Sequence, residues 1–373
     1  MFLIRSMNHI YHSLQIALIK TILPKKAVDP FPPGTTILQN ARQPLNIPTY
    51  DGLNQVVHPS VIDFLTEYGV PKWGGHRFWM VITPYPYGDD TYENPSIYVS
   101  DDGVNWFVPS NIKNPIVSAP GGWKRGFNND PDLIYDPDAD EIRVYYRFSS
   151  IDELNVKMIN ITKEQNVGEP KTIIVHSPWT QMENTHRSLC IWRESSKRWH
   201  MWGGGGAMIP PHNIYYRFSE DGIHWSSPER CVDDSGEDPF QALGYTNWHM
   251  SCKANYYEKR VEFFSYANSN SSRSNGAILY AECSMDNPKI IRTSIVNPIL
   301  LPSKKGWDNG QLYRCSFNMM DAGDRYYYRV WYSASSDKNV WKLGYTGGYV
   351  QKKPMLATNK SIGEIRRNGG LTE

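Results

Sequence analysis

The chain has 373 residues and a formal net charge of +1, so neither a basic surface for nucleic acid nor an acidic tail is indicated. Aromatic residues make up 13% of it and recur along its length, which is typical of pleated sheets and of surfaces that stack on sugar rings. The cysteines include no Cys-x-x-Cys pair, so we expect free thiols, buried at Cys190, Cys252 and Cys315, and no disulfide framework or zinc knuckle.

The first 48 residues are predicted to precede the compact domain. Apolar residues at helical spacing between Ile10 and Thr21 predict a short amphipathic helix, and a Pro-rich, extended linker follows. Polar residues interrupt the apolar stretch, so we expect neither a secretory signal nor a membrane span. A helix and linker suit attachment or oligomerisation, with packing on the side of the domain as the alternative.

An internal repeat organises the rest of the chain. Five segments share a polar residue, any residue, a small polar residue and then an apolar run, and they start at His58, Asp130, His186, His249 and Arg314. The spacings of 72, 56, 63 and 65 residues leave room in each unit for four short strands, which is one propeller blade. The sequence therefore predicts an all-β fold, a single five-bladed β-propeller over residues 49–350. A short N-terminal helix and extended linker (1–48) precede it, and a polar tail (351–373) follows.

Strands and turns can be placed within the units. We expect strands at 57–64, 77–83 and 96–99 in the first unit, and at 199–202 and 213–218 in the third. A Ser-x-Asp-Gly-x-x-Trp turn follows the third strand of both units, because Asp-Gly accepts the backbone of a tight turn. Ser335, Ser336, Asp337 and Trp341 are interpreted as a degenerate copy in the fifth unit. The stretch from Thr36 to Leu45 is a candidate to close the ring.

Propeller geometry predicts one working face. The start of each first strand and the loop after each second strand share that face, so the five repeat residues should form a ring around the channel. The loop at 84–94 is rich in tyrosines and acids, which is typical of a carbohydrate subsite, although a well-made polar loop is the alternative.

The blade number, the turns and Asn129-Asp130-Pro131-Asp132 at the start of the second blade resemble the five-bladed propeller glycoside hydrolases. That clan holds the arabinanase/xylosidase and levanase/invertase enzymes, and the Asp-box sialidases are more distantly similar. The resemblance covers roughly residues 51–348. It implies a carboxylate at the start of each of the first three blades: a base or nucleophile, an orienting Asp and a general-acid Glu.

The match to that pattern is partial. Asp130 or Asp132 fits the orienting carboxylate, and Glu183, three residues before His186, is the candidate acid. His58 stands where the first carboxylate is expected, which departs from the clan's mechanism. Acids on the adjacent loop are the candidates to replace it, namely Asp89, Asp90 and Glu93.

The histidines support a different interpretation. His58, His186 and His249, with Asp130, converge on the channel and could bind a divalent metal such as Zn, Mn or Ni. Calcium or a water-filled channel is the alternative, and no other cofactor is expected.

The leading hypothesis is a glycoside hydrolase that acts on a polysaccharide, with Asp130, Glu183 and His58 in catalysis. The candidates for sugar binding are His186, Arg187, Trp248, His249, Arg314, Tyr85, Glu93 and Asp132. The two arginines would favour an anionic glycan, or they would neutralise Asp130 or Glu183.

The alternative hypothesis is a non-catalytic glycan-binding or structural propeller, such as a receptor-binding component of a phage tail. We expect an extracellular or virion-associated protein, and a cytoplasmic location is the alternative. The sugar, its linkage, the stereochemical outcome and the oligomeric state stay open at this point.

Overall fold

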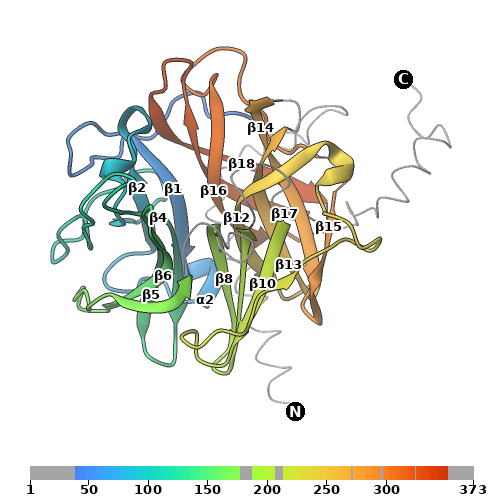
Figure 1. Cartoon of the computed structure of the whole chain (residues 1–373), viewed down its shortest axis with the longest axis horizontal. Coiled ribbons are helices and arrows are strands. Elements are labelled where there is room, and N and C mark those ends of the chain that lie inside the picture. Colours follow the sequence, from blue (N-terminus) through green and yellow to red (C-terminus); the bar gives the residue numbers. More distant parts are fainter. Residues whose placement is uncertain are drawn as a thin grey trace.

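The computed structural model describes residues 38–176, 187–205, 213–269, 272–294, 297–323 and 325–351. Its strands form five separate antiparallel sheets around a central channel (Figure 1), which confirms the predicted all-β five-bladed propeller. The predicted N-terminal helix lies outside the described residues, as does the C-terminal tail beyond residue 351.

The strands follow one another blade by blade. They are β1 (Val56–Asp63), β2 (Phe78–Pro84) and β3 (Ser96–Ser100); β4 (Phe127–Asp136), β5 (Glu141–Ser149), β6 (Leu154–Thr162) and β7 (Lys171–His176); β8 (Arg187–Ser195), β9 (Arg198–Gly205), β10 (Asn213–Ser219) and β11 (Glu229–Arg230); β12 (Tyr245–Asn255), β13 (Arg260–Ser269), β14 (Ser272–Ser284) and β15 (Asn287–Thr293); and β16 (Gln311–Asp321), β17 (Arg325–Ser335) and β18 (Trp341–Gln351). Short helical turns are α2 (Phe64–Tyr68), η1 (Pro86–Gly88), η2 (Asp90–Tyr92) and η4 (Gln241–Leu243).

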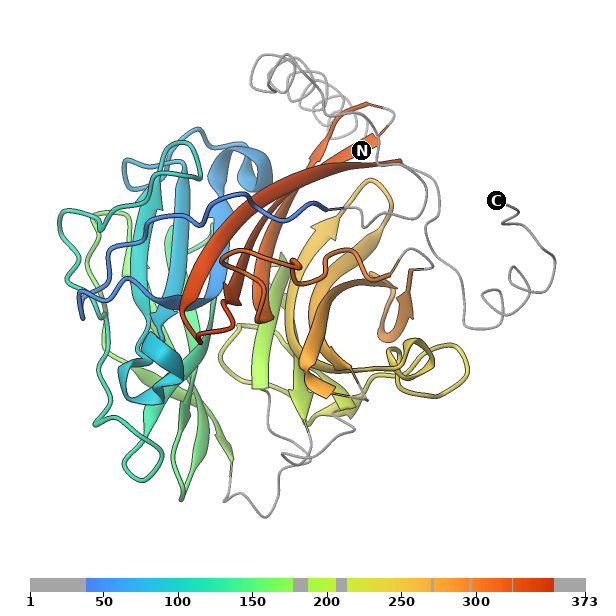
Figure 2. The ribbon, with the colours of Figure 1, turned by 90° about the horizontal axis from the view of Figure 1, so that it is seen from above.

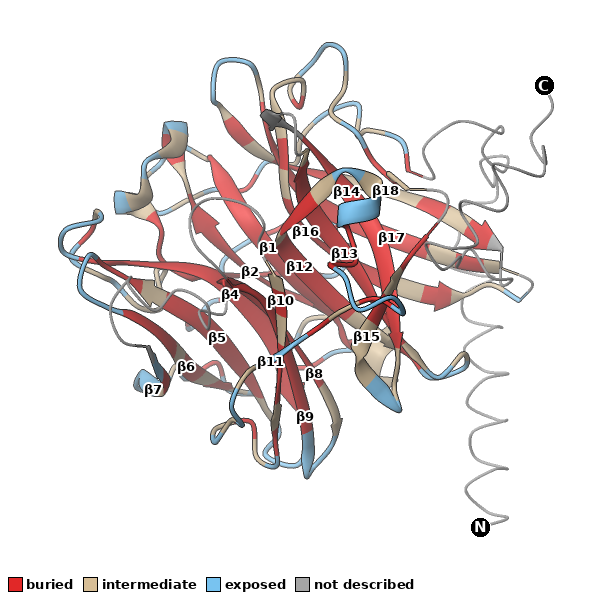
Figure 3. Ribbon diagram, turned by 45° about the vertical axis from the view of Figure 1, so that its right-hand side comes forward, coloured by how far each residue is buried: buried red, intermediate tan, exposed pale blue. Residues whose placement is uncertain are grey.

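The first strand of each blade lines the channel. β1 contacts β4 and β16, β8 contacts β4 and β12, and β12 contacts β16, so the five inner strands form a ring. Every residue of β1 and β4 is buried, and Figure 3 shows buried residues running along the inner strands while exposed ones gather in the loops. The predicted strands of the first and third units therefore lie where the sequence placed them, to within about one residue at most ends.

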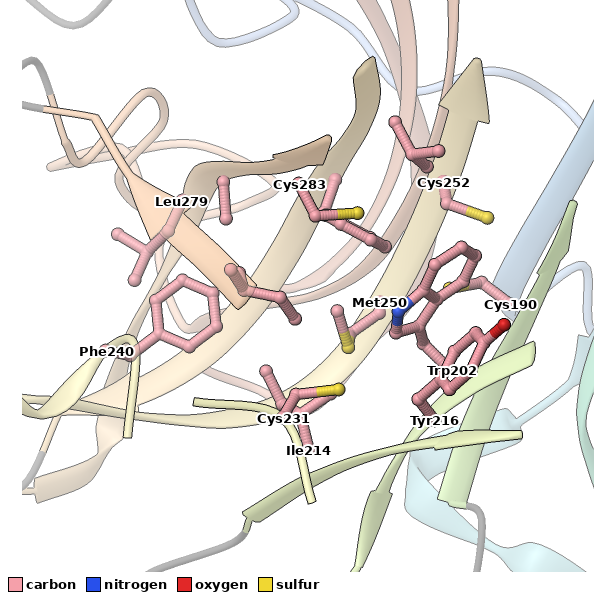
Figure 4. Packing of buried hydrophobic residues seen from close by; sticks show 14 of the residues in the cluster. Cys190, Trp202, Ile214, Tyr216, Cys231, Phe240, Met250, Cys252, Leu279 and Cys283 are labelled. Atoms are coloured by element: carbon pink, nitrogen blue, oxygen red, sulfur yellow. The ribbon is translucent and has the colours of Figure 1, made fainter. Parts of the chain in front are cut away.

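An apolar cluster fills the space between each pair of neighbouring blades. The cluster between the third and fourth blades contains Trp202, Ile214, Met250 and Phe263, together with four cysteines (Figure 4). All five cysteines are buried and unpaired, as predicted for three of them. Among the described residues each apolar cluster draws on two neighbouring blades, so each blade is stabilised by burying its faces against its neighbours.

The fifth blade has three strands of its own, and the N-terminal segment lies along its outer edge. Leu45 forms an isolated antiparallel bridge with Leu343 of β18, and its N–H donates to the Leu343 carbonyl at 2.7 Å. Figure 2 shows this blue segment beside the red β18. Closure by the 36–45 stretch is therefore confirmed at Leu45, in the form of one bridge and not a full strand.

The two Ser-x-Asp-Gly-x-x-Trp turns have the same hydrogen bonds. In the third blade the Asp221 carboxylate accepts from the N–H groups of Ile223 and His224, and Trp225 Nε1 donates to the Gly222 carbonyl. Gly222 has a φ of +73°, and an added Cβ would lie 2.8 Å from the Tyr145 hydroxyl, so only glycine fits.

The predicted third copy of this turn is wrong. Ser335 ends β17 and Trp341 begins β18, so the segment joins the second and third strands at the opposite face of the blade. Trp341 Nε1 donates to the Asn339 side chain and not to a glycine carbonyl. Without an Asp-Gly pair, the serines and the tryptophan were not sufficient to identify the turn.

The outer turns also join neighbouring blades. Tyr145 of the second blade donates its hydroxyl to the Gly222 carbonyl of the third at 2.8 Å, and Arg143 donates to the Asp221 carbonyl at 2.6 Å. Trp331 of the fifth blade donates to the Gly103 carbonyl of the first at 2.7 Å. The turns therefore hold adjacent blades in register.

The Tyr145→Phe variant should lower the free energy of unfolding by about 1 kcal/mol, because the Gly222 carbonyl loses the shorter of its two hydrogen bonds and keeps only the one from Trp225. Tyr146→Phe is the matched control, since the Tyr146 hydroxyl is buried and has no hydrogen-bond partner within the described residues. Urea denaturation of both variants tests this, and equal losses in the two would contradict the proposed role of the turn.

A charged network joins the fourth and fifth blades. Arg260 lies 2.9 Å from Glu262 and 3.1 Å from Glu282, and Tyr280 donates to Glu282 at 2.7 Å. Tyr328 of the fifth blade donates to Glu262 at 2.6 Å. Burial raises the pKa of Glu282 to about 7, against the lowering effect of Arg260. The folded protein therefore binds a proton at Glu282 that the unfolded chain releases near its ordinary pKa.

Stability should decrease as the pH rises towards 7, because a raised folded pKa favours the folded state only while the group is protonated. Glu282→Gln removes this dependence. Relative to the wild type, the variant should gain of the order of 1–3 kcal/mol of stability between pH 5 and pH 8. Denaturant unfolding at both pH values measures the difference, and a constant offset between the two proteins would contradict the assignment.

Candidate active site

Each inner strand carries one extra residue near its start. The pairing register between first and second strands shifts at Val57/Ser60, Asn129/Asp132, Arg187/Cys190, Asn247/His249 and Leu312/Cys315. At three of these bulges a non-glycine residue adopts positive φ: His58 (+59°), Asp130 (+51°) and Ser188 (+47°). Such backbone is uncommon and changes the direction of the side chain, here at the same end of the channel in all three blades.

Aligning the blades on their bulges corrects the register of the repeat. The equivalent first residues are His58, Asp130, Ser188, Trp248 and Tyr313. The sequence interpretation was therefore displaced by two residues in the third blade and by one in the fourth and fifth. In a strand that is buried on both faces, polar and apolar residues do not alternate regularly. The sequence pattern therefore could not tell one position from the next.

Three of the predicted site residues come together as one cluster. His58 Nε2 lies 3.3 Å from Asp130 Oδ1, and His249 Nδ1 lies 3.7 Å from the same oxygen. One ligand-type atom from each residue lies within 4.8 Å of the others, and all three side chains are buried. They come from β1, β4 and β12, whose starts share one face of the propeller.

The imidazole nitrogens that face Asp130 lack hydrogen-bond partners. His58 Nδ1 lies 2.9 Å from the Thr83 hydroxyl, whereas His58 Nε2 has no partner within the described residues, and neither has Nδ1 or Nε2 of His249. Asp130 Oδ2 accepts from the Ser188 N–H at 3.1 Å, which leaves Oδ1 directed at the imidazoles. Buried polar atoms left in this way need a proton or a cation between them.

The electrostatics favour neutral imidazoles and an ionised carboxylate. Burial lowers the pKa of His58 to about 4 and that of His249 well below its usual range, with Asp130 opposing both shifts. Burial alone would raise the pKa of Asp130, but Arg147 and the two histidines hold it below its ordinary value. Neutral imidazole and carboxylate are the forms that bind metal ions.

The two separations from Asp130, 3.3 and 3.7 Å, are close to those expected around one small ion. Two ligands about 2.1 Å from a zinc-sized ion lie roughly 3.0–3.4 Å apart when they subtend a right or tetrahedral angle. The three atoms together lie within 4.8 Å, so the two imidazoles would move closer to each other on binding. Thr83 beside the second nitrogen of His58 matches the hydrogen bond that orients a metal-binding histidine. The cluster could therefore hold a divalent transition metal, and two imidazoles suit Ca²⁺ poorly. His186, the third histidine predicted for a metal, lies outside the described residues.

Glu93 is a second acidic group at the cluster. Its Oε1 lies 3.6 Å from His58 Nδ1, on the opposite side of the ring from Asp130, and its side chain is buried. Burial, and then the charge of Asp130, raise the pKa of Glu93 well above its ordinary range. This carboxyl is thus a group that can hold and exchange a proton beside the cluster.

Aromatic rings surround the cluster. Tyr313 packs against His249 with ring centroids 4.1 Å apart, and its hydroxyl lies 3.3 Å from Trp248 Nε1. Trp341 lies between Tyr313 and Tyr85, at 5.3 and 5.6 Å. These rings form an apolar wall with polar edges, which is typical of a small-molecule site.

Two further arginines lie near the cluster. Arg187 lies over the Trp248 ring, 5.4 Å from its centroid, and burial, followed by the repulsion of Arg147, lowers the pKa of Arg187 to about 10. Arg147 Nη2 is 3.8 Å from Asp130 Oδ2.

The other predicted residues lie deeper in the channel or outside the described ranges. Arg314 is fully buried and donates to Asp132 at 3.0 Å and to the Leu189 carbonyl, so the carboxylate that it contacts is Asp132, whereas Asp130 and Glu183 were the two considered for it. Asp89 accepts from the Thr91 N–H within its own loop. Glu183 lies outside the described residues, and its assignment as the acid stays a prediction.

Sequence reasoning gave no site role to Thr83, Arg147 or Tyr313, although it placed the loop that starts at Arg147 on the working face. Tyr313 is the residue before Arg314 and is recovered once the bulges are aligned. Thr83 and Arg147 stand opposite residues flanking the bulges, so the pairing register identifies them as part of the site.

The chain is similar to carbohydrate-acting proteins. No family model matches it. An A type blood N-acetyl-α-D-galactosamine deacetylase from Flavonifractor plautii is 25% identical over 364 residues, covering 78% of this chain and 44% of that protein. The chain thus spans less than half the length of this relative.

Solved structures agree on the fold. An N-acetylgalactosamine deacetylase from F. plautii, in complex with blood group B trisaccharide, has a TM-score of 0.70 at 21% identity, covering 84% of this chain and 96% of that one. A thermostable family-43 glycoside hydrolase has a TM-score of 0.54 at 14% identity, covering 80% and 93%. The resemblance to propeller glycoside hydrolases is confirmed at the level of fold. Within the described ranges no helix is long and apolar enough to cross a membrane.

Proposed function

We propose that the chain is a hydrolase that removes the acetyl group from an N-acetylated sugar of a glycan, using a divalent cation held by His58, Asp130 and His249. The observation that carries the proposal is the buried cluster itself, two imidazoles with unpartnered nitrogens around one ionised carboxylate. The similarity to the F. plautii deacetylase supports the choice of reaction.

The three ligands leave room for chemistry at the cation. A divalent cation bound here would polarise an amide carbonyl and lower the pKa of a water molecule. Three protein ligands are typical of hydrolytic sites, because one coordination position stays open. Thr83 would orient His58, and Ser188 would orient Asp130, through the hydrogen bonds described above.

Glu93 is the proposed proton-transfer group. The attacking water forms a bond to the acetyl carbon as the C–N bond breaks, so one proton must leave the water and one must reach the departing nitrogen. The Glu93 carboxyl lies across the His58 ring from the cation, so in its ionised form it would take the first and deliver the second through one bridging water molecule. Acetate and a free amino sugar are then the products.

The aromatic wall would bind the sugar. Trp248, Tyr313, Tyr85 and Trp341 offer ring faces and edges beside the cluster, and a pyranose ring has a C–H-rich face that packs on such surfaces. Arg187 at Trp248 would donate to hydroxyl or carbonyl oxygens.

Glycoside hydrolysis is the second candidate. Asp130 lies at one ring nitrogen of His58 and Glu93 at the other, so two carboxyl groups lie near each other on the same face of the propeller. Glycoside hydrolysis needs such a pair of carboxyl groups. The two reactions leave different products, since a glycosidase releases a new reducing end and a deacetylase releases acetate.

Metal binding tests the cluster directly. Protein stripped with a chelator should take up one equivalent of Zn²⁺ or Mn²⁺, and His249→Ala should bind at least tenfold more weakly, as expected when one of three ligands is lost. His200→Ala is the matched control, because His200 is equally buried but has both ring nitrogens partnered, by Tyr216 and Glu194. Calorimetry would contradict the assignment if both variants bound like the wild type.

Glu93→Gln should reduce acetate release from an oligosaccharide ending in N-acetylgalactosamine by roughly 10²–10⁴-fold, because the carboxyl that transfers protons is lost. Metal uptake should persist, since Glu93 is not a proposed ligand. Glu282→Gln is the control, because it replaces a buried carboxyl of the fourth blade that is not part of the cluster, and it should retain activity. Release of reducing ends in place of acetate would favour the glycosidase.

A further inference from the structure

A cavity of about 320 Å³ opens at the other end of the channel from the His58–Asp130–His249 cluster. Its wall is formed by α2 and by the last residues of the inner strands, including Glu67, Tyr68, Lys253, Tyr256 and Met320. These strands start at the cluster, so the two sites lie on opposite faces of the propeller.

A layer of buried polar residues separates this cavity from the cluster. Arg314, which is fully buried, donates to Asp132, and Asp132 also accepts from the Ser60 hydroxyl at 2.8 Å and from the Ile191 N–H at 2.9 Å. Ser60 and Asp132 line the floor of the cavity. A molecule bound in the cavity is therefore held apart from the proposed metal centre.

The cations of the cavity wall are paired within the protein. Its three cations each contact a carboxylate: Arg77 with Asp63 at 2.7 Å, Lys253 with Glu67 at 2.7 Å, and Arg193 with Asp136 at 3.2 Å. An anionic ligand would have to compete with these carboxylates, whereas an uncharged ligand would not. The wall thus favours a neutral molecule over an anion.

Exposed aromatic rings stand at the rim. Tyr256 and Tyr257, in the turn after β12, are 61% and 65% exposed, and the Tyr256 hydroxyl accepts from Trp192 Nε1 at 3.2 Å. Two adjacent exposed tyrosines beside a hollow form an apolar surface that a folded protein rarely leaves without a use. Ring faces together with hydroxyl and ammonium donors match the apolar face and the hydroxyls of a sugar.

We propose that this cavity is a second carbohydrate-binding site, for an uncharged sugar unit of a glycan, with Tyr256 and Tyr257 as its stacking surface. It would hold a glycan chain without acting on it. The proposal goes beyond deacetylation and does not depend on it, because the cavity contains none of the residues of the cluster.

Binding of the neutral blood group B trisaccharide, followed by saturation-transfer NMR, tests this. The double variant Tyr256→Ala/Tyr257→Ala should bind the trisaccharide in the cavity about tenfold more weakly or worse. Trp248→Ala should weaken binding at the His58–Asp130–His249 cluster instead. All three changes together should abolish binding. Tyr256→Phe/Tyr257→Phe should keep binding in the cavity, and Phe107→Ala, another exposed aromatic (46%) that does not line the cavity, should change nothing.

The cavity variant should release acetate from a small soluble oligosaccharide at the wild-type rate, so failure of this proposal can be told from failure of the proposed reaction. Unchanged trisaccharide binding in the Tyr256/Tyr257 double alanine variant, with an unchanged melting temperature, would overturn the proposal. Tighter binding of sialyllactose than of the neutral trisaccharide, lost in the same variant, would overturn it as well, since it would identify an anion site.

Discussion

The inner strands converge on the channel without forming ladders with one another, so side chains must join them. Ser316 of the fifth blade accepts the N–H of Val61 in the first, and Ser60 of the first accepts the N–H of Leu133 in the second. Asp132 of the second accepts the N–H of Ile191 in the third. These bonds satisfy buried backbone donors that have no strand partner, and they fix the distance between neighbouring blades. In the first, second and fifth blades the small polar residue of the repeat is therefore structural.

The candidate active site follows from that arrangement. Once the inner strands are held at fixed spacing, one extra residue in each strand turns the next side chain towards the channel mouth. Asp130 and Asp132 lie two residues apart but have different roles. The Asp132 carboxylate accepts hydrogen bonds from Ser60, Arg314 and the Ile191 N–H of the third blade, and these hold the blades together. Asp130 keeps one oxygen directed at His58 and His249. The burial that makes the inner strands rigid also keeps both imidazoles neutral, and a metal site needs neutral imidazoles.

Much of the fold could be predicted from the sequence, because it depends on local signals. The Asp-Gly turns, the alternation of strands and the repeat spacing identified five blades, and the buried free cysteines followed from apolar runs. The register of the repeat was harder. His249 and Arg314 were assigned as equivalents of His58 although Trp248 and Tyr313 occupy that position, since a bulge adds a residue that no local pattern reveals. The ion pair of Arg314 with Asp132 joins residues 182 positions apart, and only the closed ring brings them together.

The departure from the glycoside hydrolase pattern was the most informative signal in the sequence. His58 in place of a carboxylate argued against two-carboxylate chemistry, and the structure gives that histidine a specific environment, with Asp130 on one nitrogen and Thr83 and Glu93 on the other. X-ray absorption at the zinc edge, on the zinc-loaded chain, tests the central claim most directly. We predict a first shell of nitrogen and oxygen with the scattering signature of two imidazoles, reduced to one in His249→Ala. A shell that lacks imidazole, or one unchanged by that substitution, would contradict the account.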